Sequence, residues 1–472
     1  MAKERKGSNQ GRRDRLTAEN LPFDALRRAL AWIIDEKIFS QLTFHGNTTW
    51  AASQLAVLAV LWVWSDKGTL TGAFEHAKHL AMSMLGQVAL TTYQGLTKAL
   101  VTWTGPLLPL IQGRLHNLME KIGGGHWRID GWLPLAVDGS RTTTPRTQSN
   151  EASFSATHYG QGRKARSRRK WKNKKRRSKA LSERVKPQIW LTLLWHMGLC
   201  LPWTWKTGPS TSSERGHFLE MLTTLVFPEK TLFCGDAGFV GYDLWKALQE
   251  AGHHFLIRVG ANVRLLQNLA HARESEGLVY LWPREAARKK QVPPILRLIV
   301  LQGPRGTVYL VTNVLSTKAL SDRQAARLYR LRWGVELQFR SYKQTFGRSK
   351  LRSRTPQRAL VELDWSLLGL WMIQLFAVKE QMVMDSPPER SSVALAVSVI
   401  QEAMHAWPDE ICNPHILRLR LSAAVKDEYH RTTSKRARYR PHFKDVPSAG
   451  KPRLVRATAQ QRKAYQALTI AA

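Results

Sequence analysis

The sequence predicts an α+β protein in which a mixed β-sheet, with helices on its faces, lies between helical regions at both ends of the chain. Three observations lead to this fold class. Residues 21–125 have the apolar spacing of successive helices, short apolar runs typical of buried strands begin at Leu133, and helical spacing returns after Thr355. With 472 residues, the chain has room for roughly three domains.

The N-terminal region, residues 1–127, is predicted to form a helical domain. Breaks that contain Gly or Asn separate its apolar segments, and such residues interrupt helices. The expected helices are Phe23–Leu42, Thr48–Trp64, Leu70–Leu85 and Leu107–Ile122, and the expected breaks are Gly46-Asn47, Lys67-Gly68, Gly105-Pro106 and Gly123–Gly125.

The central region, residues 128–384, is predicted to hold the mixed sheet. Its strands are expected where short apolar runs end in turn residues, with helices at Glu214–Phe227 and Tyr242–Ala251. The last three of these runs form a β-rich insertion at residues 260–312. The expected strands are Leu133–Val137, Gln188–His196, Leu199–Lys206, Thr231–Cys234, His254–Val259, Leu278–Trp282, Ile295–Leu301 and Thr307–Val311.

Two long helices are expected at the end of this region. The first begins at Ser321, which forms a capping box with Gln324, and continues to Gly347. The second, residues 355–378, is apolar enough to resemble a membrane span, but Glu362 and Asp364 interrupt it. We therefore predict a buried core helix in which these carboxylates pair with an Arg. Residues 385–472 are expected to form a C-terminal region with a helical pair at 393–430 and a basic tail.

The composition favours a nucleic-acid partner. The chain has 72 Lys and Arg against 35 Asp and Glu, a formal net charge of +37. Residues 163–179 alone hold 12 basic side chains and no acidic one. A solvated tail or a localisation signal is the usual role of such a run. Because the rest of the chain is basic too, we favour contact with phosphates.

Several other classes are disfavoured by the same composition. The three cysteines cannot form a disulfide framework, and none has CxxC spacing for zinc. No apolar stretch follows the charged N-terminal residues, so no signal peptide is expected. The longest clean apolar run, residues 55–64, is too short to span a bilayer, so no membrane partner is expected either.

The helix from Ser321 carries a polar pattern that suggests chemistry. At 100° per residue, Tyr329, Arg332, Glu336 and Lys343 share one narrow stripe beside an apolar face. The simplest alternative is a surface helix in which Arg332 and Glu336 form an ordinary i,i+4 ion pair. That alternative does not explain the Tyr and the distant Lys on the same stripe.

The spacing Tyr329-x2-Arg332-x3-Glu336-x6-Lys343 resembles the Y-R-E-K signature of bacterial DDE transposases of the insertion sequence 4 family. Two further segments resemble the family's aspartate motifs. They are Val137-Asp138-Gly139-Ser140 at a strand end, and Cys234-Gly235-Asp236-Ala237-Gly238-Phe239. Asp130 is the alternative to Asp138, but no apolar strand leads into it, and Asp236 could also simply cap a strand-to-helix turn.

The resemblance implies a ribonuclease H-like catalytic core in residues 128–384. It also implies a DNA transposase whose catalytic residues and metal ligands are Asp138, Asp236 and Glu336. Two Mg²⁺ or Mn²⁺ ions would be the cofactor, since hard cations prefer carboxylate oxygens and two of them can activate a nucleophile and stabilise a leaving oxygen. Tyr329, Arg332 and Lys343 would then face DNA, with Arg332 and Lys343 contacting phosphates.

Other expected DNA contacts are less specific. Arg258 ends a strand and could contact phosphate or form a structural ion pair, and Trp282 could stack on an unstacked base or pack in the core. The basic run supplies the remaining candidates: Arg168, Arg169, Lys170, Lys174, Lys175, Arg176 and Arg177.

The family resemblance also sets expectations for the whole reaction. It implies cut-and-paste excision and insertion of the protein's own element through a hairpin intermediate, by a homodimer assembled on double-stranded DNA at inverted-repeat ends and target. The N-terminal helices would bind the element ends and the C-terminal region would pair subunits in the bacterial cytoplasm, at the nucleoid. The alternative function is a catalytically silent DNA-binding protein derived from a transposase.

Overall fold

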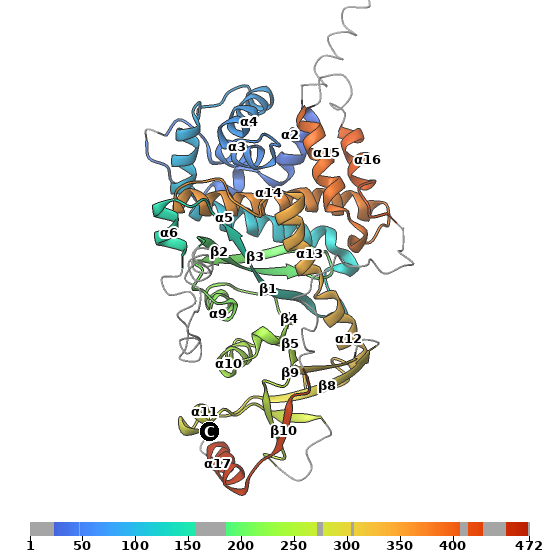
Figure 1. Ribbon diagram of the computed structural model, residues 1–472. Helices are drawn as coiled ribbons and strands as arrows, with labels where there is room; N and C mark the ends of the chain where they lie inside the picture. Colours follow the sequence, from blue (N-terminus) through green and yellow to red (C-terminus); the bar gives the residue numbers. More distant parts are fainter. Residues whose placement is uncertain are drawn as a thin grey trace, which may run out of the picture.

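One mixed sheet of ten strands runs through the described part of the chain, in the order β10-β6-β7-β8-β9-β5-β4-β1-β2-β3. The computed structural model describes residues 23–46, 48–155, 186–270, 277–303, 306–405, 414–427 and 450–470. Figure 1 shows a layer of helices covering the β3 end of this sheet, with α9 and α10 on one side of the sheet and α12 and α13 on the other. The expected α+β architecture is therefore confirmed.

Five strands form the half of the sheet nearest the helical layer. Their bounds are β1 (Leu133–Thr143), β2 (Gln188–His196), β3 (Leu201–Gly208), β4 (Thr231–Gly235) and β5 (His254–Val259). β2 is antiparallel to β1 and β3, whereas β1, β4 and β5 run parallel to one another. β4 is buried throughout, as expected for an apolar strand in the middle of a sheet covered on both faces.

The predicted β-rich insertion extends the same sheet rather than forming a separate one. Its strands are β6 (Arg264–Gln267), β7 (Leu278–Tyr280), β8 (Ile295–Gly303) and β9 (Gly306–Thr312), with the short helix α11 (Arg284–Arg288). The end of the chain returns to it: β10 (Arg453–Arg456) pairs in parallel with β6, and α17 (Ala459–Ile470) follows. Tyr465 of α17 packs its ring against Tyr280 and Trp282.

The N-terminal region is helical as expected, but the predicted helix Phe23–Leu42 is divided in two and one predicted break is absent. Its helices are α2 (Asp24–Ile33), η1 (Glu36–Phe39), α3 (Ala52–Trp64), α4 (Leu70–Leu85), α5 (Tyr93–Gly123) and η2 (Gly124–His126). α5 continues through Gly105-Pro106 and also contains Pro109. Proline in a helix removes a hydrogen bond and costs about 3 kcal/mol. The fully buried side chains of Leu107 and Ile111 offset that cost by packing into the core.

The expected core helix is α14 (Pro356–Val383), and 94% of its most apolar window is buried in the protein. It packs against α3, α5, β3 and the C-terminal helices α15 (Val393–His405) and α16 (Pro414–Ser422). The prediction that its carboxylates pair with an Arg side chain is wrong. Glu362 accepts hydrogen bonds from the backbone N–H groups of Arg352 and Ser353, and Asp364 accepts one from the Trp205 indole at 2.8 Å.

Candidate active site

Asp138 and Asp236 lie side by side because β1 and β4 are parallel neighbours. Ala136 pairs with Cys234 in the register of the two strands. Asp138 comes two residues after Ala136, still on β1, and Asp236 comes two residues after Cys234, just beyond β4. β4 ends at Gly235, whereas β1 continues to Thr143, paired with β2 along one edge and bridged to Lys350 at its last residue. The two carboxylates therefore meet at an open notch in the sheet, at the carboxyl ends of parallel strands where α/β proteins place their ligands.

Asp138 is a partly buried carboxylate that interacts electrostatically with Arg332 but forms no ion pair with the residues that the structure describes. Its Oδ1 accepts a hydrogen bond of 2.8 Å from the Gly139 backbone N–H. Burial, with smaller contributions from Asp236 and Glu336, raises the pKa of Asp138 to about 6. Asp236 caps the following turn, as its Oδ1 accepts a hydrogen bond of 2.8 Å from the Gly238 N–H. Asp130, the alternative to Asp138, forms an ion pair with Arg327 instead.

Glu336 comes from the segment that was predicted as one continuous helix, and this prediction is wrong in part. The capping box of Ser321 and Gln324 is confirmed, but α12 (Asp322–Leu331) ends before a two-residue turn. α13 (Gly334–Arg340) and the π-helical turn η4 (Ser341–Thr345) follow. A Cβ on Gly334 would overlap the ring of Trp195 on β2, so α13 approaches the sheet at this glycine more closely than any other residue would allow.

Arg332 lies in the turn between α12 and α13 and has spare donors. Its Nη2 donates to Glu336 Oε1 at 3.1 Å, and its guanidinium lies over the Tyr329 ring. The side chain is only 9% exposed, yet Nε and Nη1 have no hydrogen-bond partner among the described residues. Buried donors are normally satisfied, so these two nitrogen atoms indicate a place for an anionic ligand.

Lys343 reaches the same strand as Asp138 in spite of the irregular helix. Its Nζ donates to Ser140 Oγ at 2.6 Å, and burial lowers the pKa of this lysine. Side chains alternate between the two faces of a strand, so Ser140 and Asp138 share one face of β1. The structure thus brings Asp138, Glu336, Arg332 and Lys343 together on the α13 side of the sheet.

A fourth acid, Glu214 at the start of α9 (Glu214–Thr224), was not predicted from the sequence. The pKa of Glu214 is raised to about 7, mainly by burial and in smaller part by the nearby carboxylates of Asp138 and Asp236. The sequence gives only a weak indication that Glu214 belongs to the site, because it shows no more than an acid in the first turn of the helix that follows the second hairpin strand. Such acids commonly stabilise a helix N-terminus, so the topology had to be known before this one could be recognised.

The remaining predicted DNA contacts have different outcomes. Arg258 lies on β5 and interacts electrostatically with Tyr329, so its role in binding DNA stays a prediction. Trp282 does not face a ligand: it is 8% exposed and its indole N–H donates to the carbonyl of Gln291 at 3.0 Å. Of the two roles considered for Trp282, base stacking and core packing, the structure shows core packing. The basic residues between 168 and 177 lie outside the described residues.

The donor set at the notch suits a hard divalent cation. Asp138 and Asp236 form no ion pair with any Lys or Arg that the structure describes, although their charges and those of Glu336 and Glu214 interact. Carboxylates in this arrangement repel one another unless protons or cations are added. Oxygen ligands are those that Mg²⁺ and Mn²⁺ prefer, so the residues fit the expected metal.

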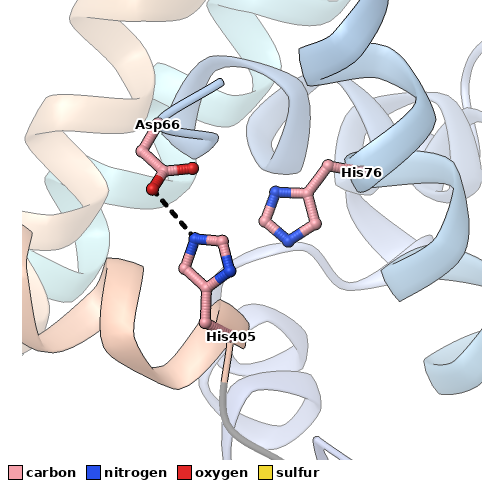
Figure 2. Close-up of side chains that lie close together, drawn as sticks. All are labelled: Asp66, His76 and His405. Carbon is pink, nitrogen blue, oxygen red and sulfur yellow. Dashed lines mark hydrogen bonds and ion pairs between the residues drawn. The ribbon is translucent and has the colours of Figure 1, made fainter. Parts of the chain in front are cut away.

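A second group of metal-binding residue types lies in the helical layer, away from the notch (Figure 2). His405 Nε2 lies 3.0 Å from Asp66 Oδ2, and the rings of His405 and His76 stack with their centroids 4.7 Å apart. Both ring nitrogens of His76 already have partners, the Ser65 hydroxyl at 3.0 Å and the Met404 carbonyl at 3.3 Å. Ring stacking therefore links α4 to α15, and the Asp66–His405 hydrogen bond links α15 to the loop after α3.

Comparison with known proteins yields transposases. A family model described as a transposase DDE domain matches residues 133–372. The transposase InsG for insertion sequence element IS4 of Escherichia coli (strain K12) is 28% identical over 312 residues, which cover 62% of this chain and 63% of that protein. A cryo-EM structure of a piggyBac transposase synaptic complex with hairpin DNA has a TM-score of 0.41 and 12% identity, covering 88% of each chain.

Proposed function

Because the chain belongs to the DDE transposase family, we propose that it is a DNA transposase that excises and inserts its own insertion sequence. The observation that carries the proposal is the convergence of Asp138, Asp236 and Glu336 where β4 ends beside the middle of β1, although they lie far apart in the sequence. A catalytically silent DNA-binding protein would gain nothing from three carboxylates gathered where phosphates would bind.

The proposed chemistry is phosphodiester cleavage and strand transfer with two Mg²⁺ or Mn²⁺ ions. When bound, such ions activate the attacking oxygen and neutralise charge on the leaving oxygen. Asp138, Asp236 and Glu336 would hold them, each from a different element of secondary structure. Arg332 would donate from Nε or Nη1, which lie on opposite edges of its guanidinium, to a phosphate of the DNA, and Lys343 would place a further positive charge on the same face of the sheet.

The core is proposed to be ribonuclease H-like. The strand order β3-β2-β1-β4-β5, with only β2 antiparallel to β1, supports this proposal. So does the position of the three carboxylates: Asp138 lies within β1, Asp236 just after the end of the neighbouring β4, and Glu336 on a helix that packs on β1.

Further features follow from the family resemblance and are proposed with it. They are cut-and-paste transposition through a hairpin intermediate, action as a homodimer on double-stranded DNA, and a place in the bacterial cytoplasm at the nucleoid. The N-terminal helices, residues 1–127, would bind the element ends, and residues 385–472 would contribute to pairing of subunits.

The test is a cleavage assay with purified protein and a duplex that carries the inverted repeats flanking its gene. We expect Mg²⁺-dependent nicking at the repeat end, followed by a hairpin product that a denaturing gel resolves. Asp138→Asn and Asp236→Asn should bind the repeat and leave it intact. Wild-type protein that binds the repeat in Mg²⁺ or Mn²⁺ but never cuts it would instead identify a silent DNA-binding protein.

A further inference from the structure

We propose that Glu214 is a fourth carboxylate ligand for the divalent cations of the active site. The inference rests on the proposed function for the reaction, but the position of Glu214 depends only on the contacts of β1, β4 and α9. Glu214 lies outside the three motifs that contain Asp138, Asp236 and Glu336.

The first contact is with Gly139, the residue after Asp138. A Cβ built on Gly139 would overlap Cγ, Cδ and Oε1 of Glu214, so the carboxylate lies directly over the backbone of β1. Gly139 is not one of the described residues with a positive φ, so the fold does not need glycine here for its backbone conformation. Space for Glu214 is therefore the physical reason for a glycine at this position.

The second contact connects Glu214 to the other aspartate. A Cβ built on Gly238 would lie 2.9 Å from Asp236 Oδ1 and 3.6 Å from Glu214 Oε2. One Glu214 oxygen thus lies over Gly139, next to Asp138, and the other is directed towards the turn that Asp236 caps. Since β4 ends at Gly235, nothing in the sheet separates Glu214, which comes from the α9 side, from the carboxylates on the α13 side.

Glu214 interacts electrostatically with Arg141 of β1 but has no close partner among the described residues. In the described ranges it forms no hydrogen bond or ion pair, whereas Glu220, six residues further along α9, pairs with Lys206 at 2.8 Å. A partly buried acid beside two other acids is unfavourable unless a cation compensates for its charge.

An independent observation places a ligand at the same notch. Arg332 interacts electrostatically with Asp138, and its side chain is 9% exposed with two nitrogen atoms that lack hydrogen-bond partners among the described residues. A cation on the carboxylates and an anion on Arg332 together match the phosphate and metal of a phosphodiester substrate. A Mg²⁺ ion is usually held by one or two carboxylates, so four carboxylates allow two for each of two ions.

The experiment measures Mn²⁺ binding to DNA-free protein by isothermal titration calorimetry. Glu214→Gln keeps the shape of the side chain and should lower Mn²⁺ affinity about tenfold or more, the size expected for loss of a group that supports a metal. Glu220→Gln, on the same helix and with the same change of charge, is the matched control and should retain wild-type affinity. Circular dichroism and the melting temperature without metal check that each variant is folded.

Gly139→Ala provides a second variant that keeps all four carboxylates. Its Cβ should push the Glu214 carboxylate away from β1 and lower Mn²⁺ affinity in the same direction. Wild-type Mn²⁺ affinity in either Glu214→Gln or Gly139→Ala would overturn the proposal. Wild-type protein that binds Mn²⁺ through Glu214 but cleaves no repeat DNA would contradict the proposed function and leave the metal ligand in place.

Discussion

The Nζ atom of Lys343 lies 2.6 Å from the Oγ atom of Ser140, although 203 positions separate the two residues in the chain. The contact joins the π-helical turn η4 to β1, two residues beyond Asp138. It fixes the amine on the face of the sheet that also carries Glu336 and Arg332. A lysine held there can either stabilise the packing of η4 or contact the DNA substrate.

Substitution of Lys343 distinguishes these two roles. Lys343→Ala should reduce the single-turnover cleavage rate by about 10²–10³, as expected for loss of a charged group that stabilises the transition state. Ser140→Ala removes only the neutral side of the hydrogen bond and should cost about 0.5–1.5 kcal/mol of stability with a small effect on cleavage. Equal cleavage rates in the two variants would show that Lys343 acts only by holding η4 to β1.

Gly334→Ala tests the close approach of α13 to the sheet. The added methyl group would overlap the Trp195 ring, and overpacking of this kind costs about 1–3 kcal/mol. We expect a lower free energy of unfolding in urea, and slower cleavage because Glu336, two residues later, is displaced. The double variant Gly334→Ala with Trp195→Leu should regain part of the stability. No loss of stability in Gly334→Ala alone would contradict the packing described for this glycine.

Asp364 predicts a pH dependence of stability that is independent of the active site. Burial raises its pKa to about 7, so the folded state binds the proton more tightly than the unfolded state does. The stability that this provides is complete at acidic pH, below the unfolded pKa, and is lost as pH rises through about 7. Asp364→Asn, which can still accept from the Trp205 indole, should therefore be more stable than the wild type at alkaline pH.

The size of this effect should be on the order of 2–4 kcal/mol at alkaline pH, since one pKa unit corresponds to about 1.36 kcal/mol. At pH values near 4 the two proteins should have similar free energies of unfolding, measured in urea. The exposed substitution Asp243→Asn changes the charge equally and serves as the control. A constant difference between Asp364→Asn and wild type at all pH values would mean that Asp364 does not titrate in this range.

The sequence predicted those elements whose structure is decided by residues close in the chain, and it failed where packing between distant residues decides. Eight of the ten described strands and α4 were found because apolar runs and turn residues mark them locally, whereas the four-residue strands β6 and β10 were missed. The break after Leu331 was missed because no Gly or Pro lies within it, and it results from packing of Gly334 on Trp195. α5 was interrupted wrongly at Pro106, because burial of one helix face there outweighs the local cost of proline.

The same distinction applies to the site. Asp138, Asp236 and Glu336 could be selected from a motif, and parallel pairing of β1 with β4 explains why two of them meet. Glu214 could not be selected, because it approaches Asp138 only through the hairpin of β2 and β3 that returns the chain to β1. The choice between base stacking and core packing for Trp282 could not be made from its neighbours in the sequence, because its ring partner, Tyr465, lies far along the chain.

The basic run at residues 163–179 gives a prediction that rests on the sequence alone. Replacing six of its Lys and Arg with Ser should weaken binding to specific and random DNA alike, because phosphate contacts carry no sequence information. The slope of log K against log[salt] should flatten by about 0.9 for each phosphate that the variant no longer neutralises. Unchanged affinity and slope in filter-binding assays would assign the run to another role.

Arg332 should act through the shape of its guanidinium as well as its charge. Nε and Nη1 donate from opposite edges of the planar guanidinium, so Arg332 can reach two different acceptor groups of the substrate in fixed directions, whereas Lys offers a single ammonium group. Arg332→Lys should therefore retain the salt dependence of DNA binding but lower the cleavage rate by about tenfold or more, the size expected when one charged hydrogen bond is removed. Arg332→Ala should lower the rate further and also reduce the salt slope by about 0.9, the value for one phosphate. Wild-type cleavage by Arg332→Lys would mean that a point charge suffices, and the two free nitrogen atoms would then have no part in holding the substrate.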